Sequence, residues 1–150
     1  MYAMFAAVLI SMLLSVVTFG RGLPCTHTTT SLRCVEYVGN HDGDTITFNI
    51  RRVHPILGDR ISVRVLGLDT PELSTADACE KAAAIKAREL VRVKLKSAKR
   101  IDLNNIGRDK YFRIDADVLL DRKNLREVIE ASGLSVPYTG GTKLKKDWCK

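Results

Sequence analysis

The chain has 150 residues, of which 45% are hydrophobic and 27% charged. This balance excludes a disordered protein and is typical of one globular domain. Lys and Arg number 24 against 17 Asp and Glu, which gives a formal net charge of +7. Such a basic surface attracts polyanions, and nucleic acid is the first candidate partner, although many basic proteins bind none.

The first twenty residues carry no charged side chain. Their apolar run from Ala3 to Phe19 is interrupted only by small hydroxyl residues, and its length lies between that of a signal-peptide core and that of a membrane span. Residues 1–20 are therefore expected to be a signal peptide cleaved after Gly20 or, alternatively, an uncleaved membrane anchor. Both interpretations predict an exported protein. A cleaved signal peptide makes it periplasmic or secreted, whereas an anchor holds its domain outside the cytoplasm. Only the anchor makes the membrane a partner.

Four cysteines follow this segment, at Cys25, Cys34, Cys79 and Cys149. An even number of cysteines in a small exported domain indicates disulfides, and four cysteines allow three pairings. We favour Cys25–Cys34, which closes a short Thr-rich loop, and Cys79–Cys149, which ties the C-terminal tail to the start of the first predicted helix. Zinc is the alternative, but the sequence has no C-x-x-C spacing and its three His are scattered.

Residues 21–33 are polar and expected to be irregular, and one folded domain is expected over residues 34–150. The alternation of polar and apolar side chains over residues 45–50 is typical of a half-buried strand. Pro55 and Asp59 mark a hairpin loop. Similar patterns, bounded by turn residues, predict five strands in all, over residues 34–40, 45–50, 61–68, 100–104 and 110–120.

Two helices are also predicted. The first follows a cap at Ser74 or Thr75 and runs to about residue 96, with apolar residues at helical spacing. The second begins at Asn124, which forms a capping box with Glu127, and ends at Gly133. The order of elements favours an α+β fold, mainly β, in which a five-stranded OB-fold barrel carries two to three helices on its outside. We expect a monomer.

Two acidic motifs stand at the ends of predicted strands, namely Asp42-Gly43-Asp44-Thr45 and Asp69-Thr70-Pro71-Glu72. Carboxylates from two strand ends can converge on one point, and they repel each other unless a cation lies between them. Oxygen ligands favour a hard ion, Ca²⁺ or Mg²⁺. Taken separately, each motif also has a simpler interpretation, as a turn or as the start of a helix.

Two arginines accompany these acids. Arg64 precedes Asp69 in the third predicted strand, and Arg113 lies in the last one. An arginine among apolar strand residues is costly unless it meets an anion, and its guanidinium group fits a phosphate with two hydrogen bonds. The alternative is that each arginine pairs with a nearby Asp.

Taken together, these motifs resemble the staphylococcal nuclease (thermonuclease) family. The resemblance rests on the segments 42–45, 63–72 and 109–113, which occur in this order, and it covers about residues 34–138. It implies an OB-fold barrel with helices and a metal-dependent endonuclease acting on DNA and RNA, with Ca²⁺ as the cofactor rather than Mg²⁺.

By this resemblance, the carboxylates of Asp44 and Asp69 and the backbone carbonyl of Thr70 bind the metal, and Asp42 supports the site. Glu72 is the implied general base, and a base at this position takes a proton from the attacking water. The two arginines are the implied phosphate-binding residues, since a phosphodiester repels a nucleophile until its charge is neutralised. The residues implied to contact the nucleotide are Lys110, Tyr111 and Tyr138.

Some features depart from the family. Phe112 stands where the family commonly has Gly, and the segment after Gly133 is short and rich in Gly. The lysines of this tail, Lys143 among them, are expected to be a solvated end. Two other functions therefore stay open: an OB-fold module, free or tethered to a membrane, that binds nucleic acid without cutting it, and an anchored structural domain with internal Asp–Arg salt bridges.

Overall fold

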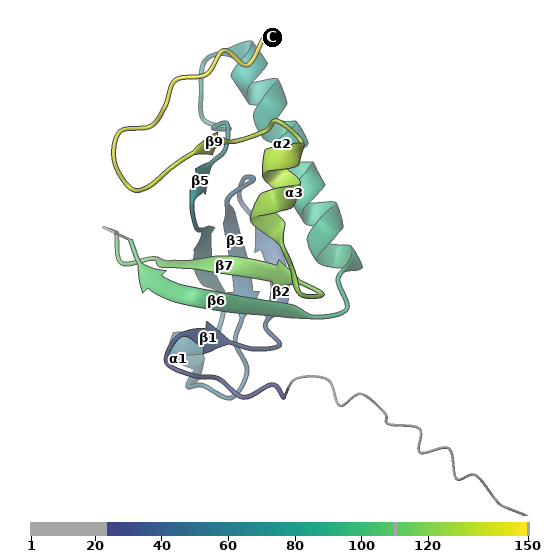
Figure 1. The fold of residues 1–150 in the computed structure, drawn as a ribbon, viewed down its shortest axis with the longest axis vertical. Coiled ribbons are helices and arrows are strands. Elements are labelled where there is room, and N and C mark those ends of the chain that lie inside the picture. The colour runs from purple at the N-terminus through teal and green to yellow at the C-terminus, as the bar shows by residue number, and fades with distance from the viewer. Residues whose placement is uncertain (1–23, 110, 150) are drawn as a thin grey trace, which may run out of the picture.

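The computed structural model describes residues 24–109 and 111–149, which form a mixed α/β domain (Figure 1). Within these residues a seven-stranded, mostly antiparallel sheet carries three helices, and two short strands form a second sheet. The segment predicted as a signal peptide or anchor, residues 1–20, lies outside the described residues, and so does Lys110. None of the helices in the described part is long and apolar enough to cross a membrane.

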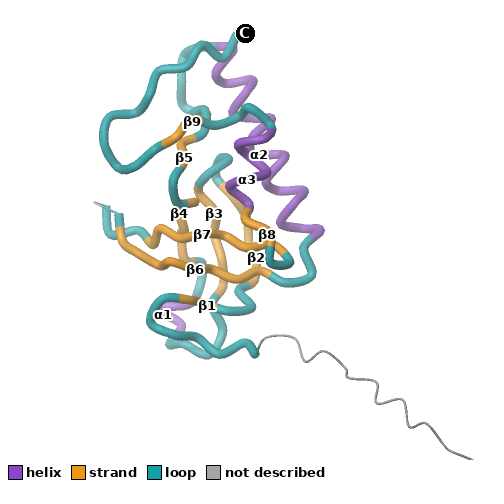
Figure 2. The backbone as a smooth tube through the Cα atoms, in the orientation of Figure 1, coloured by secondary structure: helices purple, strands orange, loops and turns teal. Residues whose placement is uncertain are grey.

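Five strands have five or more residues, and all five predicted strands are found among them. They are β2 (Glu36–Asn40), β3 (Thr45–Asn49), β4 (Ile61–Val65), β6 (Ile101–Arg108) and β7 (Ile114–Leu120). Four strands of two residues each complete the described set: β1 (Ser31–Leu32), β5 (Leu68–Asp69), β8 (Lys123–Asn124) and β9 (Val136–Pro137). The order in the main sheet is β1-β6-β7-β4-β3-β2, with β8 also on β7, and β5 pairs with β9 (Figure 2).

The path of strands is open in the described residues, because β1 and β2 stand at its two ends and do not pair with each other. The β4–β7 pair is parallel and every other pair is antiparallel. The two sides of the sheet still approach each other beside β2, where Val35 N donates a hydrogen bond of 3.0 Å to Ile101 O. The mixed fold with helices is thus confirmed, while hydrogen-bonded strands do not complete a barrel.

The last long strand begins four residues later than the sequence predicts, so Arg113 lies in the turn before β7 and not in the strand. The cause is the carboxylate of Asp109, which accepts hydrogen bonds from the backbone N of Tyr111 at 2.8 Å and of Arg113 at 2.9 Å. An acceptor of this kind stabilises a turn in place of a strand ladder. Phe112 takes a left-handed φ of 60° in this turn, the conformation that Gly adopts most readily.

Three helices are present in the described chain. The α1 helix (Pro55–Gly58) is a single turn where a hairpin loop was expected. The α2 helix (Ala78–Ser97) begins later than predicted, since its cap is Asp77, whose side chain accepts a hydrogen bond from Glu80 N at 2.9 Å. Asn124 caps α3 (Leu125–Ala131) as predicted and accepts from Arg126 N.

The hydrophobic core lies between the sheet and the helices α2 and α3, which pack against each other on one side of it (Figure 1). Phe48 from β3, Leu95 from α2 and Ile129 from α3 are almost completely buried in it. Among the described residues, its buried members all fall between Val35 and Ile129.

Both predicted disulfides are confirmed. Cys25 is bonded to Cys34 and Cys79 to Cys149, and no described cysteine is free, so the zinc alternative fails. Disulfides form and persist in oxidising compartments, and two of them in so small a domain indicate that it lies outside the cytoplasm.

Candidate functional site

A pocket of about 900 Å³ gathers most of the predicted site residues. Its wall is formed by the β2–β3 loop, the end of β4, the β6–β7 turn and the tail after β9. The predicted residues in this wall are Asp42, Arg64, Glu72, Tyr111, Arg113 and Tyr138. The three predicted metal ligands are not part of the wall, but they lie buried beside Arg64, with 3% to 5% of their surface exposed.

The β2–β3 loop brings one acidic motif against the other. Asp42 accepts hydrogen bonds from the backbone N of Asp44 at 3.1 Å and of Thr45 at 2.7 Å, which fixes the turn. A Cβ atom on Gly43 would lie 2.8 Å from Thr70 Cγ2. Only a glycine therefore permits this close approach, and Thr70 N donates a hydrogen bond of 3.0 Å to Asp44 Oδ2.

Arg64 connects the two motifs electrostatically. Its Nη2 atom lies 2.6 Å from Asp69 Oδ1 and 3.3 Å from Asp44 Oδ2. It also donates to the carbonyl oxygen of Leu68 at 3.3 Å. Burial works against the charge of Arg64, but the two carboxylates outweigh it and raise the pKa of the guanidinium group. Arg64 thus pairs with nearby Asp residues, as the alternative interpretation expects, and it also lines the pocket.

Asp44 is the most perturbed acid of the site. Burial first, and then the neighbouring carboxylate of Asp42, raise its pKa from 3.8 to about 7, although Arg64 and the N–H of Thr70 oppose this shift. A buried carboxylate with such a pKa is stabilised by any additional positive charge placed next to it.

The donor chemistry of Asp44 and Asp69 fits a hard divalent cation, because both present carboxylate oxygens to a single point now held by Arg64. These two acids provide only part of the ligands such an ion requires, and backbone oxygens and water must supply the rest. Among the described residues, one group of three potential ligand atoms lies within 4.8 Å, and it consists of Asp77, Cys79 and Cys149. That group is no metal site, because its two sulfur atoms form a disulfide.

Glu72 is half-exposed and meets an unexpected partner, Lys143 from the tail. The Nζ atom of Lys143 forms a short ion pair with Glu72 Oε1 and lies 3.0 Å from Asp69 Oδ1. Burial lowers the pKa of Lys143, but the hydrogen bonds to these two acids outweigh it and raise the pKa overall. The expectation of a solvated end is wrong for this lysine.

Arg113 is positioned by Asp109. Its Nε atom lies 2.7 Å from Asp109 Oδ2, and about a third of its side chain is exposed to the pocket. Burial raises the pKa of Asp109, but its hydrogen bonds with Arg113 outweigh this and hold the pKa below its ordinary value. Both predicted arginines also face an aromatic ring, Arg64 at 5.0 Å from that of Tyr138 and Arg113 at 5.7 Å from that of Tyr111.

Tyr138 reaches the pocket through the second sheet. Leu68 of β5 pairs with Pro137 of β9, and Tyr138 N donates a hydrogen bond of 3.1 Å to Gly67 O. Sequence reasoning assigned no role to Lys143 or Asp109. The spacing of four residues between Asp109 and Arg113 was a signal for the role of Asp109, whereas no local pattern marks Lys143.

A scan against models of known protein families finds no match for this chain, and a search of curated proteins finds none either. The resemblance to the thermonuclease family therefore stays a prediction based on the three motifs. The function has to be argued from the geometry of the pocket.

Proposed function

We propose that this protein is a metal-dependent phosphodiester hydrolase, a thermonuclease-like endonuclease that acts on DNA and RNA. The observation that carries the proposal is the position of Arg64. Its guanidinium group joins the buried carboxylates of Asp44 and Asp69 and at the same time faces a pocket lined by Glu72 and Arg113. Carboxylates and guanidinium groups thus lie together at one place, which supports phosphodiester hydrolysis, a reaction that needs a base and groups that bind the phosphate.

The proposed fold is an OB-type barrel built from β2, β3, β4, β6 and β7. The five long strands and the hydrogen bond from Val35 N to Ile101 O support this arrangement. In the proposed site Asp44, Asp69 and the backbone carbonyl of Thr70 hold a divalent cation, Ca²⁺ rather than Mg²⁺. When bound, this cation supplies positive charge to a phosphoryl oxygen.

The side chains that line the pocket have different roles in this proposal. Arg64 and Arg113 donate hydrogen bonds to the phosphate oxygens and stabilise the added charge of the transition state. Glu72 accepts a proton from water as the water oxygen bonds to phosphorus, and the bond from phosphorus to the leaving oxygen breaks. By the resemblance, the products carry 3′-phosphates. The rings of Tyr111 and Tyr138, both in the wall, offer stacking surfaces for bases.

The test uses residues 21–150 with single-stranded DNA and with RNA, in the presence of Ca²⁺ or of a chelator. We expect cleavage only with the metal. Glu72→Gln should abolish it, and Arg113→Gln should lower the rate by about 10²–10³. The matched control is Glu127→Gln, an exposed acid of α3 outside the pocket, which should cleave like the unaltered protein.

A second candidate is a nucleic-acid-binding module without catalysis. It is favoured by the ion pairs of Arg64 and Lys143, which already neutralise part of the charge on Asp69 and Glu72. Binding without cleavage in the same experiment supports this candidate. A folded sample that neither binds nor cleaves refutes both and leaves a structural domain.

A further inference from the structure

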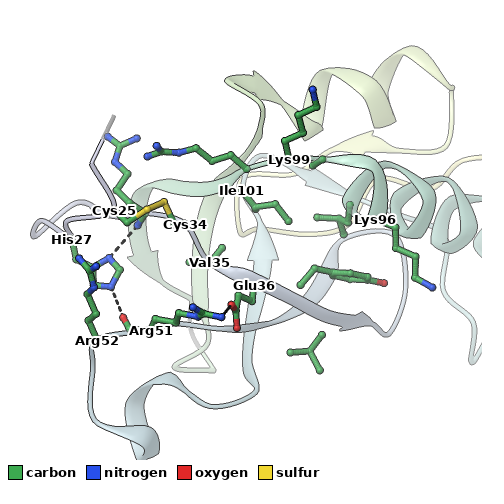
Figure 3. Close-up of a pocket in the computed structure, with 16 residues that line it drawn as sticks. Cys25, His27, Cys34, Val35, Glu36, Arg51, Arg52, Lys96, Lys99 and Ile101 are labelled. Atoms are coloured by element: carbon green, nitrogen blue, oxygen red, sulfur yellow. Dashed lines mark hydrogen bonds and ion pairs between the residues drawn. A yellow bond between two sulfur atoms is a disulfide. The ribbon is translucent and has the colours of Figure 1, made fainter. Parts of the chain in front are cut away.

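A second pocket, of about 780 Å³, is strongly basic and shares no lining residue with the candidate catalytic pocket (Figure 3). It lies between the start of the described chain, the segment that leads to α1, and the C-terminal end of α2. One acid, Glu36, lines it together with six cationic side chains. These are Arg33, Arg51, Arg52, Lys96, Lys99 and Arg100.

Internal ion pairs neutralise only part of this charge. Arg51 pairs with Glu36, and Arg33 pairs with Asp102. Three exposed cations, Arg52, Lys96 and Lys99, form no ion pair with any residue of the described chain. A pocket with such an excess attracts an anionic partner.

Two exposed aliphatic side chains come shortly after Arg51 and Arg52, which line the pocket. In α1, Ile56 is 80% exposed and Leu57 is 64% exposed. His27 ties this segment to the start of the described chain, since its Nε2 donates to Arg51 O at 2.7 Å and its Nδ1 accepts from Arg33 N at 3.1 Å (Figure 3). The cations and the two aliphatic residues therefore belong to one end of the molecule, which we call the basic end.

The basic end lies far from the candidate catalytic pocket. Strand β6 begins at Ile101, which lines the basic pocket, and ends at Arg108, which lines the other one. Eight residues of strand span about 25 Å. Figure 1 accordingly shows α1 and β1 at one end of the molecule and β5 and β9 toward the other.

The chain also reaches this end from an apolar segment. The uncharged run over residues 3–19 stops six residues before Cys25, which lines the basic pocket. Whether that run is a signal peptide or an anchor, it meets a membrane, and the basic end is the part of the domain that follows it most closely. Positive charge next to exposed aliphatic side chains is the combination with which peripheral proteins bind lipid surfaces.

We propose that the basic end binds the surface of a membrane that contains anionic phospholipids. Arg52, Lys96 and Lys99 meet the phosphate headgroups, while Ile56 and Leu57 enter the interfacial layer. A nucleic-acid backbone would also satisfy the cations, but it offers no apolar layer for two exposed aliphatic residues. Binding in this orientation leaves the candidate catalytic pocket facing the solution, open to a polymer.

The test is sedimentation of residues 21–150 with phosphatidylcholine vesicles and with vesicles of phosphatidylcholine and phosphatidylglycerol in equal amounts. This part of the chain contains the core of the described residues and all four cysteines, and a cooperative thermal transition checks that the sample is folded. We expect binding to the anionic vesicles alone. The triple variant Arg52→Gln, Lys96→Gln, Lys99→Gln should weaken it by about 100-fold.

The double variant Ile56→Ser, Leu57→Ser should weaken binding at least about tenfold, because the aliphatic contribution is lost. One matched control neutralises three exposed cations elsewhere on α2, namely Lys81, Lys86 and Arg88. The other replaces the exposed Ile85 and Leu144 with Ser. Both controls should bind the anionic vesicles like the unaltered protein, with unchanged melting temperatures for all four variants.

The proposal is overturned if anionic and neutral vesicles bind alike, if neither binds, or if the basic-end variants behave like their controls. Single-stranded DNA provides the remaining arm. If the triple variant loses affinity for DNA while vesicle binding is absent, the basic end is a nucleic-acid surface and the lipid proposal is wrong. The result does not depend on catalysis, so it can fail or succeed independently of the proposed hydrolysis.

Discussion

Replacing Asp44 with Asn tests the electrostatics of the site without a substrate. The substitution keeps the shape of the side chain and an oxygen that accepts the hydrogen bond from Thr70 N. It removes the charge that burial and Asp42 make unfavourable. It also weakens the contact with Arg64. The variant has no carboxyl group at this position, so this weakening is the same at every pH.

The magnitude follows from the pKa of Asp44, which folding raises from 3.8 to about 7. Between these values the folded protein holds a proton that the unfolded chain has released, so the free energy of unfolding falls as the pH rises. Each pH unit contributes about 1.4 kcal/mol, so the loss between about pH 4 and pH 7 amounts to about 4 kcal/mol. Below that interval Asp44 is protonated in both states, and above it the loss is complete.

The measurement is urea unfolding of the protein and of Asp44→Asn between about pH 4 and pH 8, with a chelator present. The other titrating groups are common to both proteins, so the difference between the two curves reports Asp44. We expect this difference to shift in favour of the variant as the pH rises, and Asp59→Asn, which removes an exposed carboxylate, is measured alongside as the control. Parallel curves for Asp44→Asn would show that Asp44 titrates like an ordinary carboxylate and would refute the reasoning.

Three further predictions concern the elements that hold the site together. Lys143→Gln should tighten the binding of Ca²⁺ by up to about fivefold in a calorimetric titration, because it removes a half-exposed competitor for the acidic oxygens, and unchanged affinity would contradict this role. Cys149→Ser opens a disulfide across 70 residues and should lower the free energy of unfolding by about 4 kcal/mol in urea, whereas a much smaller loss would show that the tail is held by other contacts. Gly43→Ala should cost about 1–3 kcal/mol in the same assay because its Cβ has no room, while the control Gly141→Ala, in open space, should cost almost nothing.

The strands were predictable because their side-chain alternation survives in the fold. The predicted strand over residues 45–50 appears as β3, in which Ile46 and Phe48 are buried and the residues between them are half-buried. Its register pairs Thr45 with Arg64, which brings the first acidic motif beside the strand that leads to the second, so that Asp44 and Thr70 meet across 26 residues. The convergence of the acids could thus be expected from sequence, since it depends on neighbouring antiparallel strands.

Elements that depend on side-chain hydrogen bonds were harder to predict. The turn before β7 exists because Asp109 accepts two backbone hydrogen bonds, and the alternation of residues 110–120 conceals it. The start of α2 moved from Ser74 or Thr75 to Asp77 for a similar reason, because several residues there can act as caps and the hydrogen bond decides between them.

The tail was unpredictable for another reason. Lys143 reaches Asp69 and Glu72 because the tail is fixed at two distant points, by the β5–β9 pair before it and by Cys149 after it. Such a placement depends on the global fold, and a lysine in a Gly-rich tail looks like any solvated residue. The open path of strands was unpredictable for the same reason, because whether a barrel closes depends on how the ends of the sheet meet.

For the proposed hydrolase, the charges of the site predict that a cation and a phosphodiester bind to it cooperatively. Arg64 now serves Asp44 and Asp69, and a phosphate in the pocket attracts the same guanidinium group. Any shift of Arg64 toward the phosphate leaves two buried carboxylates with less compensation, which is costly at low dielectric. In the proposed site, a divalent cation on these carboxylates would remove that cost and would free Arg64 to join Arg113 at the phosphate. By linkage, a bound phosphodiester must then raise the affinity for the cation by the same factor.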